Sequence, residues 1–151
     1  MSTLNQLLKS DAKLPIAKEV VLSLVFTNNY ITDQLKKLFK NNDLSGQQYN
    51  VLRILRGQKG IPVNQQTIQE RMVHKNSNTG RIIDKLVEKE LVNRKQCPEN
   101  RRQVKLTITN KGLNILLNLD PKLDGIESNI VNKLTHKEAT TLCYLLEKLR
   151  T

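Results

Sequence analysis

The 151-residue chain contains no tryptophan, and aromatic residues make up only 3% of it. No phenylalanine, tyrosine or tryptophan occurs between Val51 and Cys143. Proteins that bind RNA or single-stranded DNA commonly stack the bases on aromatic side chains. The sequence therefore disfavours this class of partner, and competition between duplex and single strand in a gel-shift assay separates the two alternatives.

Cysteine and histidine are also scarce, with two of each. Cys97 and Cys143 lie far apart and match no disulfide or metal spacing, and the two histidines are isolated. No apolar run reaches the roughly 18 residues that span a bilayer, and the N-terminus lacks the layout of a signal peptide. We expect no metal, no cofactor, no membrane partner and a cytoplasmic location. No nucleophile-base pair, paired carboxylates or phosphate-cradling glycine loop is present, so the sequence does not predict an enzyme.

Acidic residues are outnumbered, and the formal net charge is +11. Between Arg53 and Lys111 there are 14 basic and five acidic residues, so this span carries +9 of that charge. Such a surplus costs self-repulsion in the folded state and usually serves a polyanionic partner. The middle of the chain is therefore predicted to face an anion.

The spacing of apolar residues predicts a mainly α-helical protein with one β-hairpin. Ile61–Val63 is too short for more than an edge strand, and Asp120-Pro121 is expected to break or kink the sixth element. Cys143 lies beside the apolar stripe of the last helix, where a core thiol is the simplest interpretation. Helix caps are predicted at Ser45, Asn64, Thr109 and Thr135. In chain order, the elements are a helix over 15–40, a helix over 44–55, a short helix over 64–72, a helix over 76–90, a hairpin over 91–109, a helix after Thr109 and a last helix after Thr135.

Two short, tightly joined helices followed by a hairpin are typical of a winged helix-turn-helix, whose second helix enters the DNA major groove. Asparagine and arginine on the exposed side of that helix suit base reading. Arg101 and Arg102 at the bend of the hairpin would be attracted by the negative potential of the adjacent minor groove. Cations along the strands are expected to contact phosphates. The predicted DNA-binding residues are Lys75, Asn76, Ser77, Asn78, Arg81, Lys85, Arg94, Lys95, Arg101, Arg102 and Lys105.

The stretch from Asn64 to Gly112 resembles the core of the MarR (multiple antibiotic resistance regulator) family of bacterial transcription factors. The wing pattern of that family is Asp-x-Arg-x-x-x-(Val/Ile)-x-Leu-(Thr/Ser). The corresponding segment here runs from Asn100 to Thr109 and reads NRRQVKLTIT. The resemblance extends to the helices on either side and covers most of the chain from Pro15 onward.

The resemblance implies an obligate homodimer with an all-α dimerisation domain, whose two winged units read a pseudo-palindrome in duplex DNA. It also implies repression of a promoter, released by a small and often phenolic ligand. Arg102 would be the wing arginine. Phe26, Tyr30 and Tyr49 are candidates for the ligand pocket, although core packing explains these aromatics equally well. The corresponding division is 1–42 for an N-terminal dimerisation region, 43–110 for the DNA-binding domain and 111–151 for the C-terminal dimerisation helices.

Three departures from the family pattern matter. Asn100 replaces the acid that orients the wing arginine, and an amide cannot make a charge-assisted hydrogen bond to it. Glu90 replaces a helix-ending glycine, so a left-handed backbone there would be strained. The first long helix lacks the cysteine of the peroxide-sensing branch. Two further alternatives stay open: a winged helix used only for protein contacts, and a regulator without a small-molecule ligand.

Overall fold

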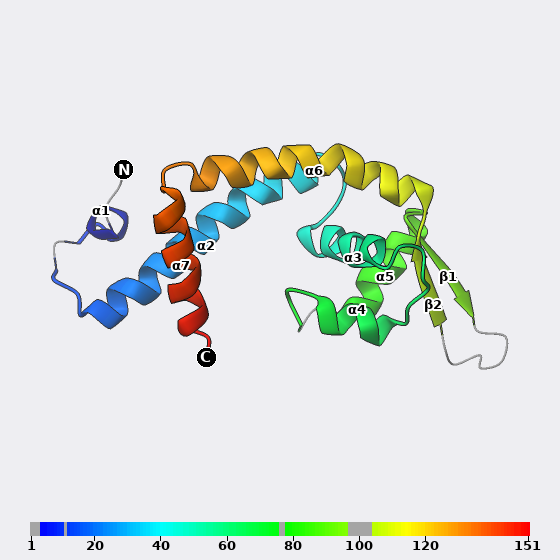
Figure 1. Ribbon diagram of the computed structural model, residues 1–151, viewed down its shortest axis with the longest axis horizontal. Helices are drawn as coiled ribbons and strands as arrows, with labels where there is room; N and C mark the ends of the chain where they lie inside the picture. Colours follow the sequence, from blue (N-terminus) through cyan, green and yellow to red (C-terminus); the bar gives the residue numbers. More distant parts are fainter. Residues whose placement is uncertain (1–3, 11, 76–77, 97–103) are drawn as a thin grey trace.

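The structure is a computed structural model that describes residues 4–10, 12–75, 78–96 and 104–151. Figure 1 shows an arch in which α2 and α6 run side by side, with the winged helix at one end and α7 and both termini at the other. The elements are α1 (Leu4–Leu8), α2 (Ile16–Lys40), α3 (Gly46–Gly57), α4 (Gln65–Arg71), α5 (Thr79–Glu88), β1 (Val92–Gln96), β2 (Val104–Ile108), α6 (Asn110–Val131) and α7 (His136–Lys148). The mainly α fold with a winged helix is confirmed. The sequence pattern does not predict α1, because five residues give little more than one helical turn.

The four predicted helix caps are confirmed. The Ser45 hydroxyl accepts a hydrogen bond from Gln48 N, and the Gln48 side chain returns one from Ser45 N, which completes a capping box. Thr135 and Glu138 form a second capping box at α7. Asn64 and Thr109 cap α4 and α6. These side chains satisfy backbone N–H groups that the first turn of a helix leaves unpaired.

The core lies inside the winged helix and under the first half of α6. It holds side chains from every element of that unit and from α6, so the first half of α6 is part of the same core. Burial of this kind contributes about 1.5–3 kcal/mol for each large aliphatic side chain. The largest fully buried side chains are Val51, Leu52, Leu55, Ile68, Ile83, Leu86, Leu91, Leu106, Leu116 and Leu119.

The hairpin is an antiparallel pair in which Val92 lies opposite Ile108 and Gln96 opposite Val104. Leu106 also exchanges two backbone hydrogen bonds with Val63, with N···O distances of 2.8 and 3.1 Å. The predicted edge strand before α4 is thus a single bridge residue. This bridge joins the wing to the segment between α3 and α4.

Non-glycine residues with left-handed backbones follow four of the described helices, namely Lys9 after α1, Asp43 after α2, Lys59 after α3 and Glu90 after α5. Asp43 follows α2 with φ of 51°, and Glu90 follows α5 with φ of 60°. At α5, Leu91 N bonds to Leu86 O and Glu90 N bonds to Val87 O, which is the Schellman pattern of helix termination. The expected strained conformation of Glu90 is therefore confirmed.

The expected break at Pro121 is wrong, because α6 runs unbroken over 22 residues with Pro121 inside it. The alternative of a kink at this residue stays a prediction. Proline removes the hydrogen bond to the carbonyl of Leu117, four residues earlier. The Leu117 side chain is 67% exposed, so this missing bond lies on the solvent side of the helix. Buried Leu116, Leu119 and Leu123 lie on the inner side before and after the proline. Their packing holds both halves of α6 in one helix.

The arm opposite the winged helix buries little of its own apolar surface. None of the 13 residues of α7 is buried in the single chain, and Cys143, predicted as a core thiol, is exposed. The same holds for α2, in which Phe39 is the one residue that is buried in the single chain. Within the part of the chain that the structure describes, no helix is both long and apolar enough to cross a bilayer.

Candidate nucleic-acid interface

Helices α4 and α5 form the predicted helix-turn-helix, and α5 begins at Thr79 rather than near residue 76. Asn78 is its N-cap, and its Oδ1 accepts a hydrogen bond of 3.3 Å from Arg81 N. A bidentate contact of Asn78 with adenine would therefore require the side chain to leave the cap. Lys75 lies exposed in the turn, while Asn76 and Ser77 lie outside the described residues.

Ile82, Ile83 and Leu86 hold one face of α5 against the core. The exposed side chains on the rest of the helix point in three directions. Arg81 is exposed at the N-terminal end of the helix. Asp84 accepts a hydrogen bond of 2.5 Å from Arg94 Nη2 on β1. Lys85 instead lines a cavity on the other side of α5. Of the predicted base readers on this helix, Arg81 occupies the position that suits the major groove best.

The wing carries two lysines directly opposite each other. Lys95 on β1 pairs in register with Lys105 on β2, and both side chains are exposed. Like charges at such a position destabilise a hairpin unless an anion lies between them. Arg94 is on the other face of β1, opposite buried Leu106, which explains its pairing with Asp84. The predicted wing arginines, Arg101 and Arg102, lie outside the described residues, as does Asn100.

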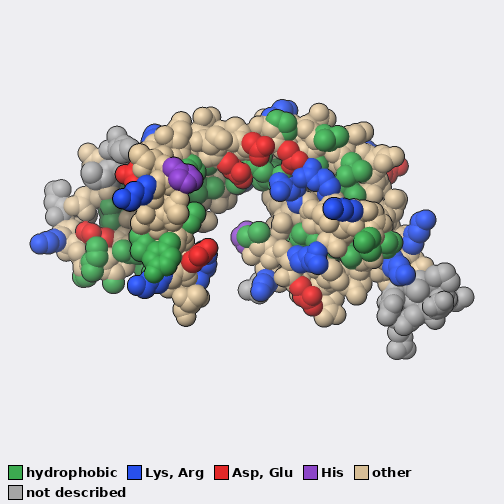
Figure 2. Space-filling model, in the orientation of Figure 1, with side chains coloured by type: hydrophobic (Ala, Val, Ile, Leu, Met, Phe, Trp, Pro, Cys, Tyr) green, Lys and Arg blue, Asp and Glu red, His purple; other side chains and the backbone are tan. Residues whose placement is uncertain are grey.

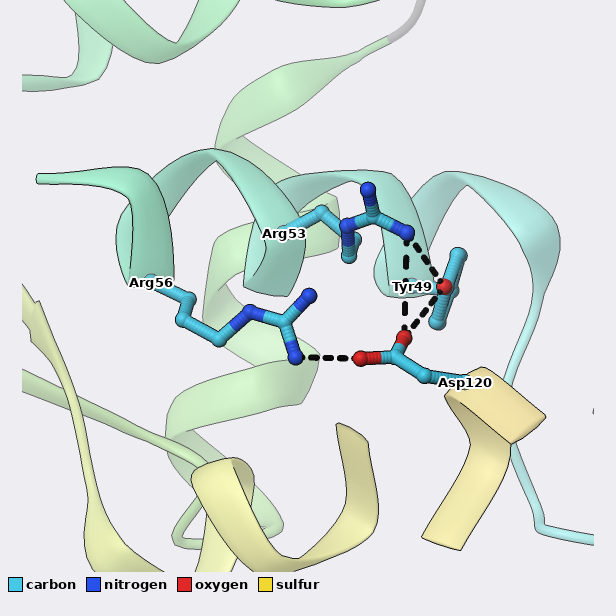
Figure 3. A network of polar contacts seen from close by, with 4 residues as sticks. All are labelled: Tyr49, Arg53, Arg56 and Asp120. Atoms are coloured by element: carbon cyan, nitrogen blue, oxygen red, sulfur yellow. Dashed lines mark hydrogen bonds and ion pairs between the residues drawn. The ribbon is translucent and has the colours of Figure 1, made fainter. Parts of the chain in front are cut away.

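A polar network joins the winged helix to α6 (Figure 3). The Tyr49 hydroxyl donates to Asp120 Oδ1 at 2.8 Å and accepts from Arg53 Nη1 at 2.9 Å. Arg56 Nη1 donates to the second carboxylate oxygen of Asp120, and Arg53 also lies over the Tyr49 ring, 5.8 Å from its centroid. Three side chains from successive turns of α3 thus converge on one carboxylate of α6.

Partial burial and the neighbouring charges act in opposite directions on the groups of this network. Burial alone would raise the pKa of Asp120, but hydrogen bonds from Arg56 and Tyr49 and the positive charges of Arg56 and Arg53 lower it. Burial raises the pKa of Tyr49, the Arg53 hydrogen bond opposes that rise, and Asp120 reinforces it. The network therefore favours a neutral tyrosine between a carboxylate and two guanidinium groups.

Changing Asp120 to Asn is expected to lower the free energy of unfolding at neutral pH by about 1–2 kcal/mol, because it leaves two arginines without their counter-ion. The lowered pKa of Asp120 stabilises the folded protein above the ordinary range of a carboxyl group. This contribution is lost as the pH falls through the lowered pKa. The difference between the two proteins should thus shrink below about pH 4. Thermal unfolding measured across pH checks this.

Asp124→Asn, on the same helix, is the control for loss of one carboxylate charge. The interpretation fails if Asp120→Asn and Asp124→Asn give the same dependence of unfolding on pH.

A cavity of about 1020 Å³ lies between α2, α3, α5 and α6. Its apolar wall includes Leu35, Phe39 and Leu123, and Tyr49 also lines it. The Phe39 and Tyr49 rings are 5.0 Å apart between centroids. Lys36, Lys40, Lys85 and Lys89 give the cavity positive groups, and Asp43, Glu88 and Glu127 give it acidic ones. An apolar space with a few polar groups is typical of a small-molecule site.

Of the three predicted pocket residues, Tyr49 alone lines this cavity. Phe26 and Tyr30 lie earlier on α2, where the helix has left the winged helix, and Tyr30 is 55% exposed. Position along α2 decides which side chains reach this cavity, so the assignment of Phe26 and Tyr30 to a ligand pocket stays a prediction. Phe39 is the α2 aromatic in the lining, and its position next to the last residue of the helix was the available signal.

Two acidic residues of this region could not be found by pattern. Asp120 and Asp43 contact hydrogen-bond partners that are 46 to 71 positions away in the sequence. The spacing of Tyr49, Arg53 and Arg56 does place all three on one side of α3, but nothing local identifies their partner. Among the described residues, no three His, Cys, Asp or Glu side chains form a group that could hold a metal ion.

Basic side chains are exposed on the winged helix. Figure 2 shows Lys and Arg side chains over this unit and a group of hydrophobic side chains on the arm that carries α7, with side chains of both kinds at each end of the arch. An exposed helix start, a wing with facing lysines and an excess of cations form a surface that suits the two grooves and the phosphates of a duplex.

Comparison with known proteins agrees with this geometry. The sequence profile of the MarR family matches residues 44–104. The transcriptional regulator MhqR of Bacillus subtilis is 25% identical over 134 residues, which cover 87% of this chain and 91% of that protein. A MarR transcription factor from Planctomyces limnophilus is 29% identical, with a TM-score of 0.71 over 90% of this chain and 98% of the other. BpsR of Bordetella bronchiseptica, 20% identical, shares the fold with a TM-score of 0.75 over 88% and 99% of the two chains.

The matched segment runs from the start of α3 to the start of β2, which is the basic unit described above. With its winged helix, basic surface and matching relatives taken together, the chain is similar to the MarR family of transcriptional regulators over residues 44–104 and shares the fold of MarR regulators over most of its length.

Proposed function

We propose that this protein is a homodimeric repressor that binds a pseudo-palindromic site in duplex DNA and is released by a small ligand. The observation that carries the proposal is the placement of Arg81 at the exposed start of α5, beside a wing whose Lys95 and Lys105 face each other. A phosphate between the two lysines would remove their repulsion. Arg81 would then face base edges in the major groove.

The other predicted DNA-binding residues have different proposed roles, which depend on where each one lies. Lys75 in the turn suits a phosphate at the edge of the major groove. The proposed roles of Asn76, Ser77, Arg101 and Arg102 rest on the sequence. Arg94 is assigned to support α5 through Asp84 as well as to the backbone of the duplex. Lys85, which faces the cavity, is the weakest member of the predicted set.

The dimer is proposed from the arm that includes the start of α2 and α7. A 13-residue helix with no buried residue cannot hold its place by packing within one chain, and exposed apolar patches of this kind mark protein interfaces. A second copy that covers them would set two α5 helices about one helical turn of DNA apart. The exposed apolar residues of this arm are Ile16, Val20, Val21, Leu24, Val25, Leu142, Tyr144, Leu145 and Leu149.

The cavity between α2, α3, α5 and α6 is the proposed ligand site. BpsR, which shares the fold, has its DNA binding regulated by 6-hydroxynicotinic acid. A small aromatic acid fits the chemistry of the lining here, because the paired Phe39 and Tyr49 rings and four lysines line the same cavity.

The proposed function is tested by selecting bound duplexes from a random pool with the purified protein. Arg81→Ala should reduce the base preference at one position in each half-site, while Lys95→Ala should weaken all duplexes by a similar factor. Affinity should fall steeply with salt, with a log–log slope of about −0.9 for each neutralised phosphate. Equal binding to unrelated duplexes, or affinity that is indifferent to salt, would contradict the proposal.

Ligand release is tested separately, with the selected duplex and a series of small aromatic acids. A ligand of the cavity should raise the temperature of unfolding of the free protein and lower its affinity for the duplex. If DNA binding is specific and no acid changes it, the alternative of a regulator without a small-molecule ligand is favoured. Phe39→Ala, which opens the cavity wall, should weaken the response to any acid that binds there.

A further inference from the structure

Lys89 lies where the end of α5 meets the end of α2. It is the C-cap residue of α5, and its ammonium group donates to the main-chain carbonyl of Asp43 and, at 2.8 Å, to Asp43 Oδ2. Asp43 is the left-handed residue that ends α2. One lysine therefore bridges two helix C-termini, each of which carries partial negative charge.

Local preferences do not explain an aspartate at position 43. A left-handed residue after a helix is usually glycine or asparagine, and a carboxylate is unfavourable beside the negative end of the helix dipole. The Asp43 side chain is 93% exposed, so packing does not select it either. The contact with Lys89 is the interaction that accounts for an acid at this position.

The remaining side chains of α5 position it within the winged helix alone. Ile83 and Leu86 are buried in the core of that unit, and Asp84 is paired with Arg94 of the wing. Lys89 instead reaches the end of α2, the helix that runs to the opposite end of the arch (Figure 1). The pair thus bears on the orientation of α5 relative to α2.

We propose that Lys89 and Asp43 are positioning residues that hold α5 in its DNA-binding orientation relative to α2. This inference rests on the proposed function, in which α5 enters the major groove of a duplex. Both residues also line the cavity, so the same pair is in reach of any molecule bound there.

Two variants of Asp43 give the sharpest test. Loss of the negative charge alone predicts tighter binding to DNA, and relief of backbone strain predicts a folded state that is no less stable, whereas the proposal predicts weaker binding. Asp43→Asn and Asp43→Gly each remove a negative charge, which by itself strengthens binding to a polyanion. Glycine and asparagine also suit the left-handed backbone, so the folded state should be no less stable. We expect both variants nevertheless to bind the selected duplex about three- to tenfold more weakly.

Lys89→Met should weaken binding to a similar degree, and the double variant Lys89→Met/Asp43→Asn should be no weaker than Lys89→Met alone. Lys111→Met is the matched control, because Lys111 makes a similarly exposed ion pair of 2.9 Å with Glu90 at the other side of the end of α5. It removes the same positive charge and leaves the link to α2 intact. Its effect on the duplex affinity should be less than twofold.

Hydrogen exchange of the free protein decides the inference without DNA. Amides of the last turn of α5 and of the turn after α2 should exchange faster in Lys89→Met than in Lys111→Met. Equal exchange in the two variants, or duplex binding by the Asp43 variants that is unchanged or tighter, would overturn the inference. If the wild-type protein binds no duplex, the proposed function fails, and the exchange comparison still tests the link between the two helices.

Discussion

Changing Gly112 to Ala should destabilise the protein by about 3 kcal/mol or more, a large share of the stability of an ordinary domain. A Cβ atom at this position would lie 2.6 Å from the carbonyl oxygen of Leu91 and 2.8 Å from Ile108 Cγ1. The first turn of α6 packs directly on the segment between α5 and β1, where Thr109 N also donates to Leu91 O. Neither backbone can retreat without disturbing the end of α5. Denaturant unfolding measures the loss.

Gly125→Ala is the control for this prediction. Gly125 lies in the same helix, and no atom comes within 4 Å of a Cβ built there. Alanine should therefore stabilise α6 by about 0.5–1 kcal/mol through its better helix propensity. If both variants change the free energy of unfolding in the same direction, the close approach at Gly112 does not have the cost assigned to it.

Changing Leu145 to Asp should separate the proposed dimer and abolish specific binding to a two-half-site duplex. Leu145 is 49% exposed on a helix that buries none of its residues in the single chain. In the proposed dimer, two carboxylates would be placed in an apolar interface without partners. The dissociation constant of the dimer should rise by about 100-fold or more. Sedimentation velocity gives the oligomeric state, and gel shifts on duplexes with one and two half-sites give the affinity.

Leu117→Asp is the matched substitution at an exposed leucine outside the proposed interface. Leu117 is 67% exposed on the part of α6 that packs on the winged helix. This variant should sediment like the wild-type protein. An unchanged sedimentation coefficient for Leu145→Asp, or an equal effect of both variants, would remove α7 from the interface.

The sequence was a good guide to features that depend on neighbouring residues. Ser45 and Thr135 could be identified as caps because a cap needs its partner three residues later. The wing could be placed because apolar and polar residues alternate along it. The left-handed backbone of Glu90 could be anticipated because this residue stands where the resemblance to the family places a helix-ending glycine.

Features that depend on tertiary contacts could not be predicted. Pro121 was expected to interrupt α6, but packing on the inner side of the helix outweighs the one hydrogen bond lost on its outer side. Asp120 and Asp43 meet their partners across the fold, and no spacing rule connects them. The cavity depends on where α2 passes α3, so residue type alone does not decide whether Phe26 and Tyr30 line it.

Pro121 also has a mechanical consequence. A helix that lacks one backbone hydrogen bond bends most easily at that turn, and α6 is the beam of the arch that connects its two ends (Figure 1). Bending of α6 is therefore easiest beside Asp120, which accepts hydrogen bonds from Arg56 and Tyr49 of α3. Pro121, where α6 bends most easily, is thus adjacent to Asp120, which links α6 to α3. Because α6 is long, a small rotation at Pro121 changes the distance between the winged helix and the opposite end of the arch.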